Sequence, residues 1–403
     1  MSAQCSPPPT PAGREADPAA RSDAADARAP ADARTRAWLD VDLAALAGNA
    51  RRLRARAGVP LVPMVKADAY GLGAVAAART LVALGPDTVW GLGVATADEG
   101  AELRDAGIAA RVVVFPPLVE HDLARAARLG LTPSLHRAGE VLRWAALGGG
   151  AWHLAIDTGM SRAGVSWDAL DADLLAAVRA HPPEGAYTHF HSAERADGSR
   201  ERQEARFRAA LDALPTRPPL LHAENSPAVV RGARSPWDLV RPGLYLYGAT
   251  CVDDAADAHS ASPAPAPLDA PEPVAHLRAR ILDLRDLPAG ETVSYGATWR
   301  APGPRRIATV AVGYADGYRR SLSGRGVALV GGREVPVVGL VTMDLTMLDV
   351  TDVPCAIGDV ATLLGRDGDR VLTVDDVARR GDLSPYELLA GLRLRVPHVH
   401  HAA

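Results

Sequence analysis

Residues 61–73 read LVPMVKADAYGLG, an apolar run that ends at Lys66 and leads through glycines into a helical stretch. A short apolar run of this kind is typical of a buried parallel strand. The same order of strand and helix recurs along the chain. Strands are expected at 61–65, 88–94, 111–115, 131–134, 152–156, 186–190, 220–223 and 238–241. Helical patterns lie between them at 73–85, 97–106, 119–129, 137–147, 167–180 and 201–213.

Eight strand and helix units over roughly 200 residues predict a (β/α)8 TIM-type barrel, placed at residues 37–250. A doubly wound open sheet is the structural alternative, because periodicity does not distinguish a closed sheet from an open one.

The residues before the barrel, 1–36, contain almost no large apolar side chain and are expected to form a disordered tail. They also lack the apolar segment of a secretory signal, which favours a cytoplasmic location.

The character of the sequence changes after the barrel. Residues 251–273 are rich in Pro, Ala and Asp and are interpreted as a linker. A smaller, mainly β domain is expected at 274–403. Its β-type runs lie at 274–284, 291–295, 307–312, 326–330, 334–340, 345–350 and 359–364, and a last helix is expected at 374–380. The histidines His398, His400 and His401 are expected to form an exposed chain end rather than a metal site.

Composition excludes several classes of function. The 403 residues are 48% hydrophobic and 23% charged, as in ordinary globular enzymes, and no window is apolar enough to span a membrane. A net charge of -4 and 4% aromatic residues offer neither a basic field nor stacking surfaces for nucleic acid. The three cysteines have no metal-binding spacing. Composition therefore indicates neither a membrane protein nor a nucleic-acid-binding protein, and we expect no metal site.

The chain contains one lysine, Lys66, among 44 Lys and Arg residues. Arginine can replace lysine at most solvated positions, but a guanidinium does not lose its proton and cannot attack a carbonyl as a neutral amine. The position of Lys66 at the end of a buried strand argues against chance survival on the surface. Lys66 is therefore a candidate for covalent amine chemistry.

Active sites of such barrels lie at the carboxyl ends of the strands. Polar side chains gather there: Lys66, Asp68 and Tyr70 after the first strand, Arg162 after the fifth, His189 and His191 after the sixth, Asn225 and Ser226 after the seventh, and Arg241 after the eighth, followed by Gly243 and Leu244. A lysine, an anion-binding corner and two arginines match the aldehyde, phosphate, ring nitrogen and phenolic oxygen of pyridoxal 5'-phosphate.

Several motifs together resemble the alanine racemases. VKADAYGLG, IDTGMSRAG, THF, ENSP, VRPGLYLYG, VSYGATW, VGYADGY, TMD and SPYE follow in the order of that family, over about residues 37–397. The resemblance implies a racemase that interconverts L-alanine and D-alanine with pyridoxal 5'-phosphate, and so supplies D-alanine for peptidoglycan. It also implies a head-to-tail homodimer in which each active site is completed by the partner.

The resemblance assigns roles to single residues. Lys66 would form the Schiff base with the cofactor and act as one base, and Tyr295 of the other subunit would be the opposing base. Two bases are also expected chemically, because a racemase removes a proton from one face of a planar intermediate and returns one to the other. Arg241 would face the pyridine nitrogen and keep it unprotonated, and His189 would hydrogen-bond Arg241.

The remaining carried-over residues bind the cofactor and the substrate. Those implied to hold the cofactor phosphate are Tyr70, Ser226, Gly243, Leu244 and Tyr386, with Asn225 beside them. Arg162 would meet the phenolic oxygen and the substrate carboxylate, which the backbone of Met343 would also meet across the interface. Tyr314 would line the access channel.

Two positions depart from the family. Ala155 stands where a carbamylated lysine often supports the arginine, and Thr342 to Leu345 replace a Cys-Met-Asp-Gln run. Serine or a broader set of amino acids is therefore an alternative substrate, and a decarboxylase on the same fold is an alternative activity. Residues 71–76 also fit G-x-G-x-x-A, a nicotinamide-binding pattern, but its glycines follow the strand end by five residues and no acidic residue suits a ribose.

Overall fold

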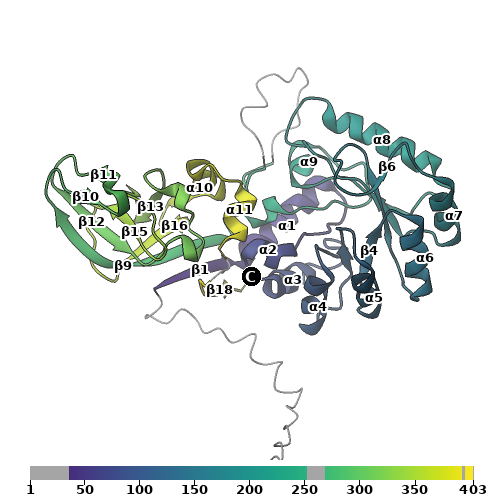
Figure 1. The fold of residues 1–403 in the computed structure, drawn as a ribbon, viewed down its shortest axis with the longest axis horizontal. Coiled ribbons are helices and arrows are strands. Elements are labelled where there is room, and N and C mark those ends of the chain that lie inside the picture. Colours follow the sequence, from purple (N-terminus) through teal and green to yellow (C-terminus); the bar gives the residue numbers. More distant parts are fainter. Residues whose placement is uncertain (1–35, 252–267, 393–394, 403) are drawn as a thin grey trace, which may run out of the picture.

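The computed structural model describes residues 36–251, 268–392 and 395–402. They form an α/β barrel and a C-terminal, mainly β domain, which lie next to each other along the long axis of the molecule (Figure 1). The predicted tail, apart from Arg36, and most of the predicted linker lie outside the described residues. Among the helices of the described ranges, none combines the length and the apolar character of a membrane span.

Six barrel strands follow one another in a parallel sheet. They are β2 (Leu92–Val94), β3 (Val112–Val114), β4 (Thr132–Leu135), β5 (His153–Asp157), β7 (Gly185–Tyr187) and β8 (Leu220–His222), and the short β6 (Val165–Ser166) pairs with β5. The first and last predicted strands are reduced to isolated parallel bridges. Leu61 pairs with both Val89 and Val240, and Asn225 pairs with Arg241. These bridges close the ring, which an open sheet would not do, and confirm the predicted barrel.

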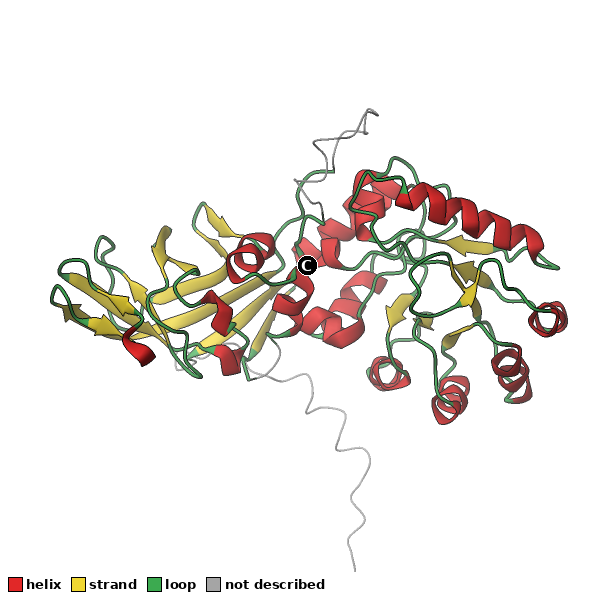
Figure 2. Ribbon diagram, turned by 45° about the horizontal axis from the view of Figure 1, so that its top comes forward, coloured by secondary structure: helices red, strands yellow, loops and turns green. Residues whose placement is uncertain are grey.

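Helices surround the barrel strands on the outside (Figure 2). They are α1 (Leu43–Ala57), α3 (Ala74–Val82), α4 (Ala97–Asp105), α5 (Glu120–Arg128), α6 (Ala138–Ala146), α7 (Ala172–Ala180), α8 (Ser199–Ala213) and α9 (Ser226–Arg231). Their apolar faces turn inward: α4 buries Ala97, Ala101 and Leu103. Helix α7 begins later than the pattern predicts, because the Asp171 side chain accepts a hydrogen bond from the backbone N–H of Leu174 and caps the helix there.

The C-terminal domain is built on a nine-stranded sheet whose central strand is β9 (Ala275–Leu287). The other strands of this sheet are β1 (Ala37–Asp42), β12 (Arg305–Val310), β13 (Val327–Val330), β14 (Arg333–Pro336), β15 (Thr346–Asp349), β16 (Val360–Asp367), β17 (Arg370–Leu372) and β18 (His398–His401). A hairpin of β10 (Thr292–Val293) and β11 (Trp299–Arg300) forms a separate pair. Each predicted β-type run of this domain overlaps one of these strands.

The C-terminal histidines lie in a strand and not in a free tail. His400 and His401 are exposed, but residues 398–401 form β18, which pairs in parallel with β1. His400 Nε2 lies 2.8 Å from the carbonyl oxygen of Leu72, and His401 Nε2 lies 2.9 Å from Asp40 Oδ1. The expected exposure of His400 and His401 is present, but the interpretation of this segment as a free tail is wrong, because it belongs to a sheet. No local pattern indicates this pairing, because the two strands lie at opposite ends of the described chain.

The two domains are connected through β1 and pack against each other at the segment that begins at Lys66. Strand β1 belongs to the C-terminal sheet but runs directly into barrel helix α1. Helices α10 (Val374–Gly381) and α11 (Pro385–Ala390) follow the sheet, and α11 packs against α2 (Lys66–Gly71). At Gly71, with φ of 85°, a Cβ atom would lie 2.6 Å from the carbonyl oxygen of Leu389, so this close approach requires glycine.

Candidate active site

A pocket of about 560 Å³ opens at the carboxyl ends of the barrel strands. Nine of the predicted site residues line it: Lys66, Tyr70, Arg162, His189, Asn225, Ser226, Arg241, Gly243 and Tyr386. Leu244 is buried and begins a 3-10 helix, Leu244–Tyr247, directly after Gly243. The predicted residues Tyr295, Tyr314 and Met343 do not line the pocket. The barrel therefore brings together the expected cofactor residues, whereas the residues expected from a partner lie elsewhere on the chain.

The Lys66 side chain enters the pocket with its amine open to a ligand. Among the described residues, none forms a hydrogen bond or ion pair with its ammonium group. Burial is the main cause that lowers the pKa of Lys66, and the charge of Arg162 lowers it further, while Glu99 opposes the shift. Both main causes favour the neutral amine. An amine of lowered pKa suits the capture of a carbonyl compound.

The backbone of α2, which starts at Lys66, turns in the left-handed sense. Ala67, Asp68, Ala69 and Tyr70 all have φ between 51° and 58°, the region that residues with a Cβ atom rarely occupy. Such a conformation costs about 1–2 kcal/mol per residue, so the surrounding contacts must hold it. Sequence propensity missed this turn, because Ala, Asp and Tyr in a row do not indicate a left-handed conformation.

One corner of the pocket combines hydroxyl groups with a glycine. Ser226 Oγ accepts hydrogen bonds from the N–H of Gly243 at 2.8 Å and of Tyr245 at 3.4 Å. A Cβ atom at Gly243 would lie 2.3 Å from Tyr70 Oη, so only glycine leaves this space open. The Tyr70 ring lies 5.8 Å from that of Tyr386, and burial raises the pKa of both phenols, so both stay protonated donors.

Arg241 is buried at the base of the pocket without a carboxylate partner among the described residues. Its guanidinium donates to the carbonyl oxygens of Thr188, His222 and Ala223 at 2.6, 2.8 and 3.1 Å. It also donates to His222 Nδ1 at 2.8 Å and lies 3.3 Å from His189 Nδ1. Burial lowers the pKa of Arg241 to about 10, so the group remains a cation at neutral pH. The expected contact between His189 and Arg241 is present.

The histidines around Arg241 are neutral. Burial, with the charge of Arg241 next, lowers the pKa of His189 to about 3 and that of His222 well below its usual value. Because Arg241 donates to His222 Nδ1, the proton of His222 is on Nε2, which donates to His153 Nδ1 at 2.8 Å. The proton of His153 then faces Glu184, whose Oε2 lies 3.7 Å away. His222 was not among the predicted site residues, although His222 ends the strand that precedes Asn225.

Arg162 lies in the loop after β5. Asp157 shapes this loop by accepting hydrogen bonds from the N–H groups of Gly159 at 2.9 Å and Ser161 at 3.1 Å. Ala155, the position that departs from the family, is buried and lines the pocket. No carboxylate of the described part of the chain forms an ion pair with Arg162. The guanidinium is therefore available for a substrate anion.

The three predicted residues outside the pocket are exposed on the C-terminal domain. Tyr295 is 73% exposed, Met343 53% and Tyr314 38%. Tyr295 lies between β10 and β11, at the end of the domain farthest from the barrel (Figure 1). Tyr314 and Met343 lie on two adjoining loops, since the N–H of Tyr314 donates to the Thr342 carbonyl at 3.0 Å. Exposed aromatic and sulfur-containing side chains of this kind suit an interface.

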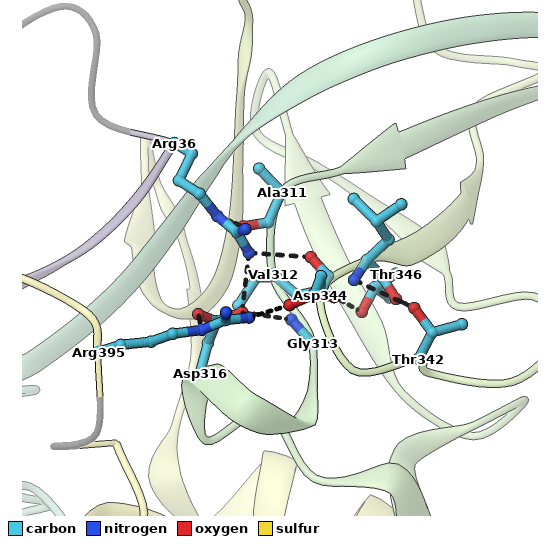
Figure 3. Close-up of polar contacts among 10 residues, drawn as sticks. Arg36, Ala311, Val312, Gly313, Asp316, Thr342, Asp344, Thr346 and Arg395 are labelled. Atoms are coloured by element: carbon cyan, nitrogen blue, oxygen red, sulfur yellow. Dashed lines mark hydrogen bonds and ion pairs between the residues drawn. The ribbon is translucent and has the colours of Figure 1, made fainter.

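An arginine and aspartate cluster fixes these two loops (Figure 3). Asp316 is 2% exposed, and its carboxylate accepts from Arg36 at 3.0 Å, Arg395 at 2.8 Å and the N–H of Gly313 at 2.8 Å. Arg36 also donates to the carbonyl oxygen of Asp344 at 2.9 Å, and Arg395 pairs with the Asp344 carboxylate. The cluster joins the loop of Tyr314 to the turn of Met343.

Comparison with known proteins covers both domains. Residues 41–251 match the sequence model of the alanine racemase N-terminal domain, and residues 274–400 match that of the C-terminal domain. An alanine racemase of Deinococcus radiodurans is 41% identical over 367 residues, which cover 90% of this chain and 98% of that protein.

Two solved structures are also similar. The Bacillus anthracis alanine racemase with bound L-Ala-P has a TM-score of 0.79 at 30% identity, with 93% of this chain and 96% of that chain covered. The Bartonella henselae alanine racemase with covalently bound pyridoxal phosphate has a TM-score of 0.77 at 27% identity, with 91% and 100% covered.

Proposed function

Since the chain belongs to the alanine racemase family, we propose that it interconverts L-alanine and D-alanine with pyridoxal 5'-phosphate as its cofactor. The observation that carries this proposal is a pocket that holds both the open amine of Lys66 and the buried guanidinium of Arg241. When bound, the cofactor supplies an aldehyde that captures amines and a ring that accepts electrons from the α-carbon.

The residues of the pocket fit this cofactor. The space that Gly243 leaves beside the Tyr70 hydroxyl, with Ser226, Asn225 and Tyr386 around it, suits a phosphate. The guanidinium of Arg241 would face the pyridine nitrogen. Because Arg241 is a cation and its histidine neighbours are neutral, a proton on that nitrogen is disfavoured. This limits the electron-accepting power of the ring and with it side reactions such as transamination.

Racemisation requires a base on each face of the α-carbon. Lys66, whose pKa is lowered mainly by burial, takes or returns the proton on one face. Tyr295 serves the other face. Because the Tyr295 segment lies at the far end of the C-terminal domain of its own chain, this role requires a second copy of the chain (Figure 1). We therefore include a homodimer with shared active sites in the proposal.

The substrate carboxylate is assigned to Arg162, with the backbone of Met343 from the partner, and Tyr314 would line the access channel. The exposure of Met343 and Tyr314 and the position of Arg162 in the pocket wall support these roles. Alanine is the substrate that the family favours. The further proposals of a cytoplasmic location and of D-alanine supply for peptidoglycan rest on the family alone.

Racemisation of a panel of L-amino acids tests the proposal. Purified protein, with and without added pyridoxal 5'-phosphate, is incubated with L-alanine, L-serine and larger amino acids, and loss of optical rotation is followed. We expect loss of rotation with alanine and a dependence on the cofactor. If the cofactor-loaded protein leaves the optical rotation of L-alanine unchanged, the assignment is refuted. Faster loss of rotation with L-serine than with L-alanine would identify serine as the preferred substrate.

A further inference from the structure

Glu99, on helix α4, is bonded to the backbone beside Lys66. Its carboxylate accepts a hydrogen bond from the N–H of Ala67 at 2.7 Å and another from the N–H of Ala95 at 2.6 Å. Ala95 follows β2, the barrel strand that forms a bridge to Met64 through Gly93. One half-buried carboxylate therefore joins the segment that carries Lys66 to the neighbouring strand.

The geometry is not that of an ordinary helix cap. Thr96 caps α4, since its Oγ1 accepts from the N–H of Glu99 at 3.1 Å. In a capping box, the acid at the third helical position would bond back to the N–H of the capping residue, Thr96. Glu99 bonds instead to Ala95 and to Ala67 of the neighbouring segment. The side chain is thus directed away from the role that its helix position favours.

Ala67 is the residue at which the left-handed turn begins. The turn holds four residues with a Cβ atom at positive φ, and a conformation so disfavoured persists only where its surroundings determine it. Asp68, the second residue of the turn, accepts through Oδ1 a hydrogen bond from the N–H of Ala74 at 2.7 Å. At the near end, Glu99 holds the N–H of Ala67. The peptide bond that follows Lys66 is therefore fixed by Glu99.

The charge of Glu99 also acts on Lys66. Burial and Arg162 lower the pKa of Lys66, and Glu99 is the group that raises it. His189, which also faces Lys66, is neutral because burial lowers its pKa to about 3. The charges that act on the amine thus come from one cation, Arg162 in the loop after β5, and one anion, Glu99 on α4. The position and the basicity of the amine depend on the same carboxylate.

We propose that Glu99 is a positioning residue for Lys66: it holds the left-handed turn at Ala67 and supplies the negative charge that balances Arg162. This inference rests on the proposed role of Lys66 as the cofactor-binding amine and base. It predicts that Glu99→Gln, which keeps the size of the side chain but not its charge, disturbs Lys66. The carboxylate of Glu99 accepts from both N–H groups, one through each oxygen. The single amide oxygen of Gln can accept from one of them, so the other N–H loses its acceptor.

The single lysine allows a direct test. Protein grown on lysine labelled with ¹³C at Cε shows one side-chain signal in the cofactor-free form, and its pH titration reports Lys66 alone. We expect the midpoint of Glu99→Gln to move to lower pH than wild type. Glu102→Gln is the matched control, because Glu102 lies one turn further on α4 and is exposed. An unchanged midpoint in Glu99→Gln, or an equal shift in Glu102→Gln, would overturn the electrostatic part.

The positioning part is tested by cofactor retention. Dialysis of protein loaded with pyridoxal 5'-phosphate, followed by absorbance, should show about tenfold weaker binding in Glu99→Gln than in wild type, since one backbone N–H loses a charged acceptor. Ala67→Gly removes the Cβ penalty at positive φ and should recover much of the loss in the double variant. If Glu99→Gln weakens binding equally with and without the Ala67→Gly change, positioning through the turn is refuted.

The outcomes separate this inference from the proposed function. Wild-type protein that binds no cofactor and racemises no amino acid contradicts the function. Wild-type protein that does both, while Glu99→Gln matches it in titration and retention, contradicts only the role of Glu99. If Glu99→Gln alone does not fold, the double variant with Ala67→Gly supplies both measurements, and a double variant that also fails to fold would show a general structural role and overturn the proposal.

Discussion

Replacing the buried Asp316 by Asn tests the arginine and aspartate cluster of the C-terminal domain. The Asp316 carboxylate has three donors, Arg36, Arg395 and the N–H of Gly313, and is almost fully buried. Loss of a buried, paired charge costs about 3–5 kcal/mol. The two arginines are 44% and 45% exposed, so solvent screens part of this interaction. We therefore expect Asp316→Asn to lower the free energy of unfolding by about 2 kcal/mol.

The assay is thermal unfolding followed by circular dichroism. A loss of about 2 kcal/mol should lower Tm by about 4–8 °C if the domain unfolds as one unit. Asp344→Asn is the control, because its carboxylate is half exposed and pairs with Arg395, and its expected cost is at most about 1 kcal/mol. Asp316→Asn should also raise the KM for alanine more than it lowers kcat, since the cluster holds the loops of Tyr314 and Met343. Equal Tm values for Asp316→Asn and wild type would refute the reasoning.

Three further predictions concern the pocket and the interface. Lys66→Arg should leave the fold intact but abolish the visible absorbance of bound cofactor and racemisation, and a variant that kept its visible band would contradict the assignment, because the chain has no second lysine. Gly243→Ala, whose Cβ would lie 2.3 Å from Tyr70 Oη, should weaken cofactor retention in dialysis about tenfold or more. Unchanged retention would show that the cofactor does not occupy this space. Lys66→Ala and Tyr295→Phe dimers should each be nearly inactive, and refolding them together should restore about a quarter of wild-type activity, since about half of the dimers are mixed and each has one intact site. No recovery, with subunit exchange confirmed by native mass spectrometry, would refute the shared site.

The barrel and the contents of its pocket could be predicted from the sequence for a physical reason. Short apolar runs followed by polar residues or glycines show where strands end and helices begin. The carboxyl ends of barrel strands then meet at one rim. Lys66, Ser226 and Arg241 could therefore be placed together from the sequence alone. The neighbour His222 could not, because the bond from Arg241 to His222 depends on how side chains pack under the rim.

Long-range pairing and backbone strain were the parts that the sequence did not show. The turn at 67–70 contradicts the local preference of its residues and is held by Glu99, 32 positions from Ala67. Strand β1 pairs with β9 and β18, which lie far along the chain and have no complementary local pattern. In both cases tertiary contacts determine the conformation. They override local propensity in the turn, and local propensity gives no information on the strand pairing.

The pairing of β1 has a consequence for the synthesis of the chain. Residues 37–42 leave the ribosome before the barrel, but their parallel partner, residues 398–401, follows the barrel and all the other strands of the C-terminal sheet. Until then β1 keeps one edge unpaired, and an open edge of a growing chain is a site of misassociation. Closure of this edge therefore waits until residues 398–401 have been made, and a barrel truncated after residue 251 would expose an unpaired strand that leads straight into α1.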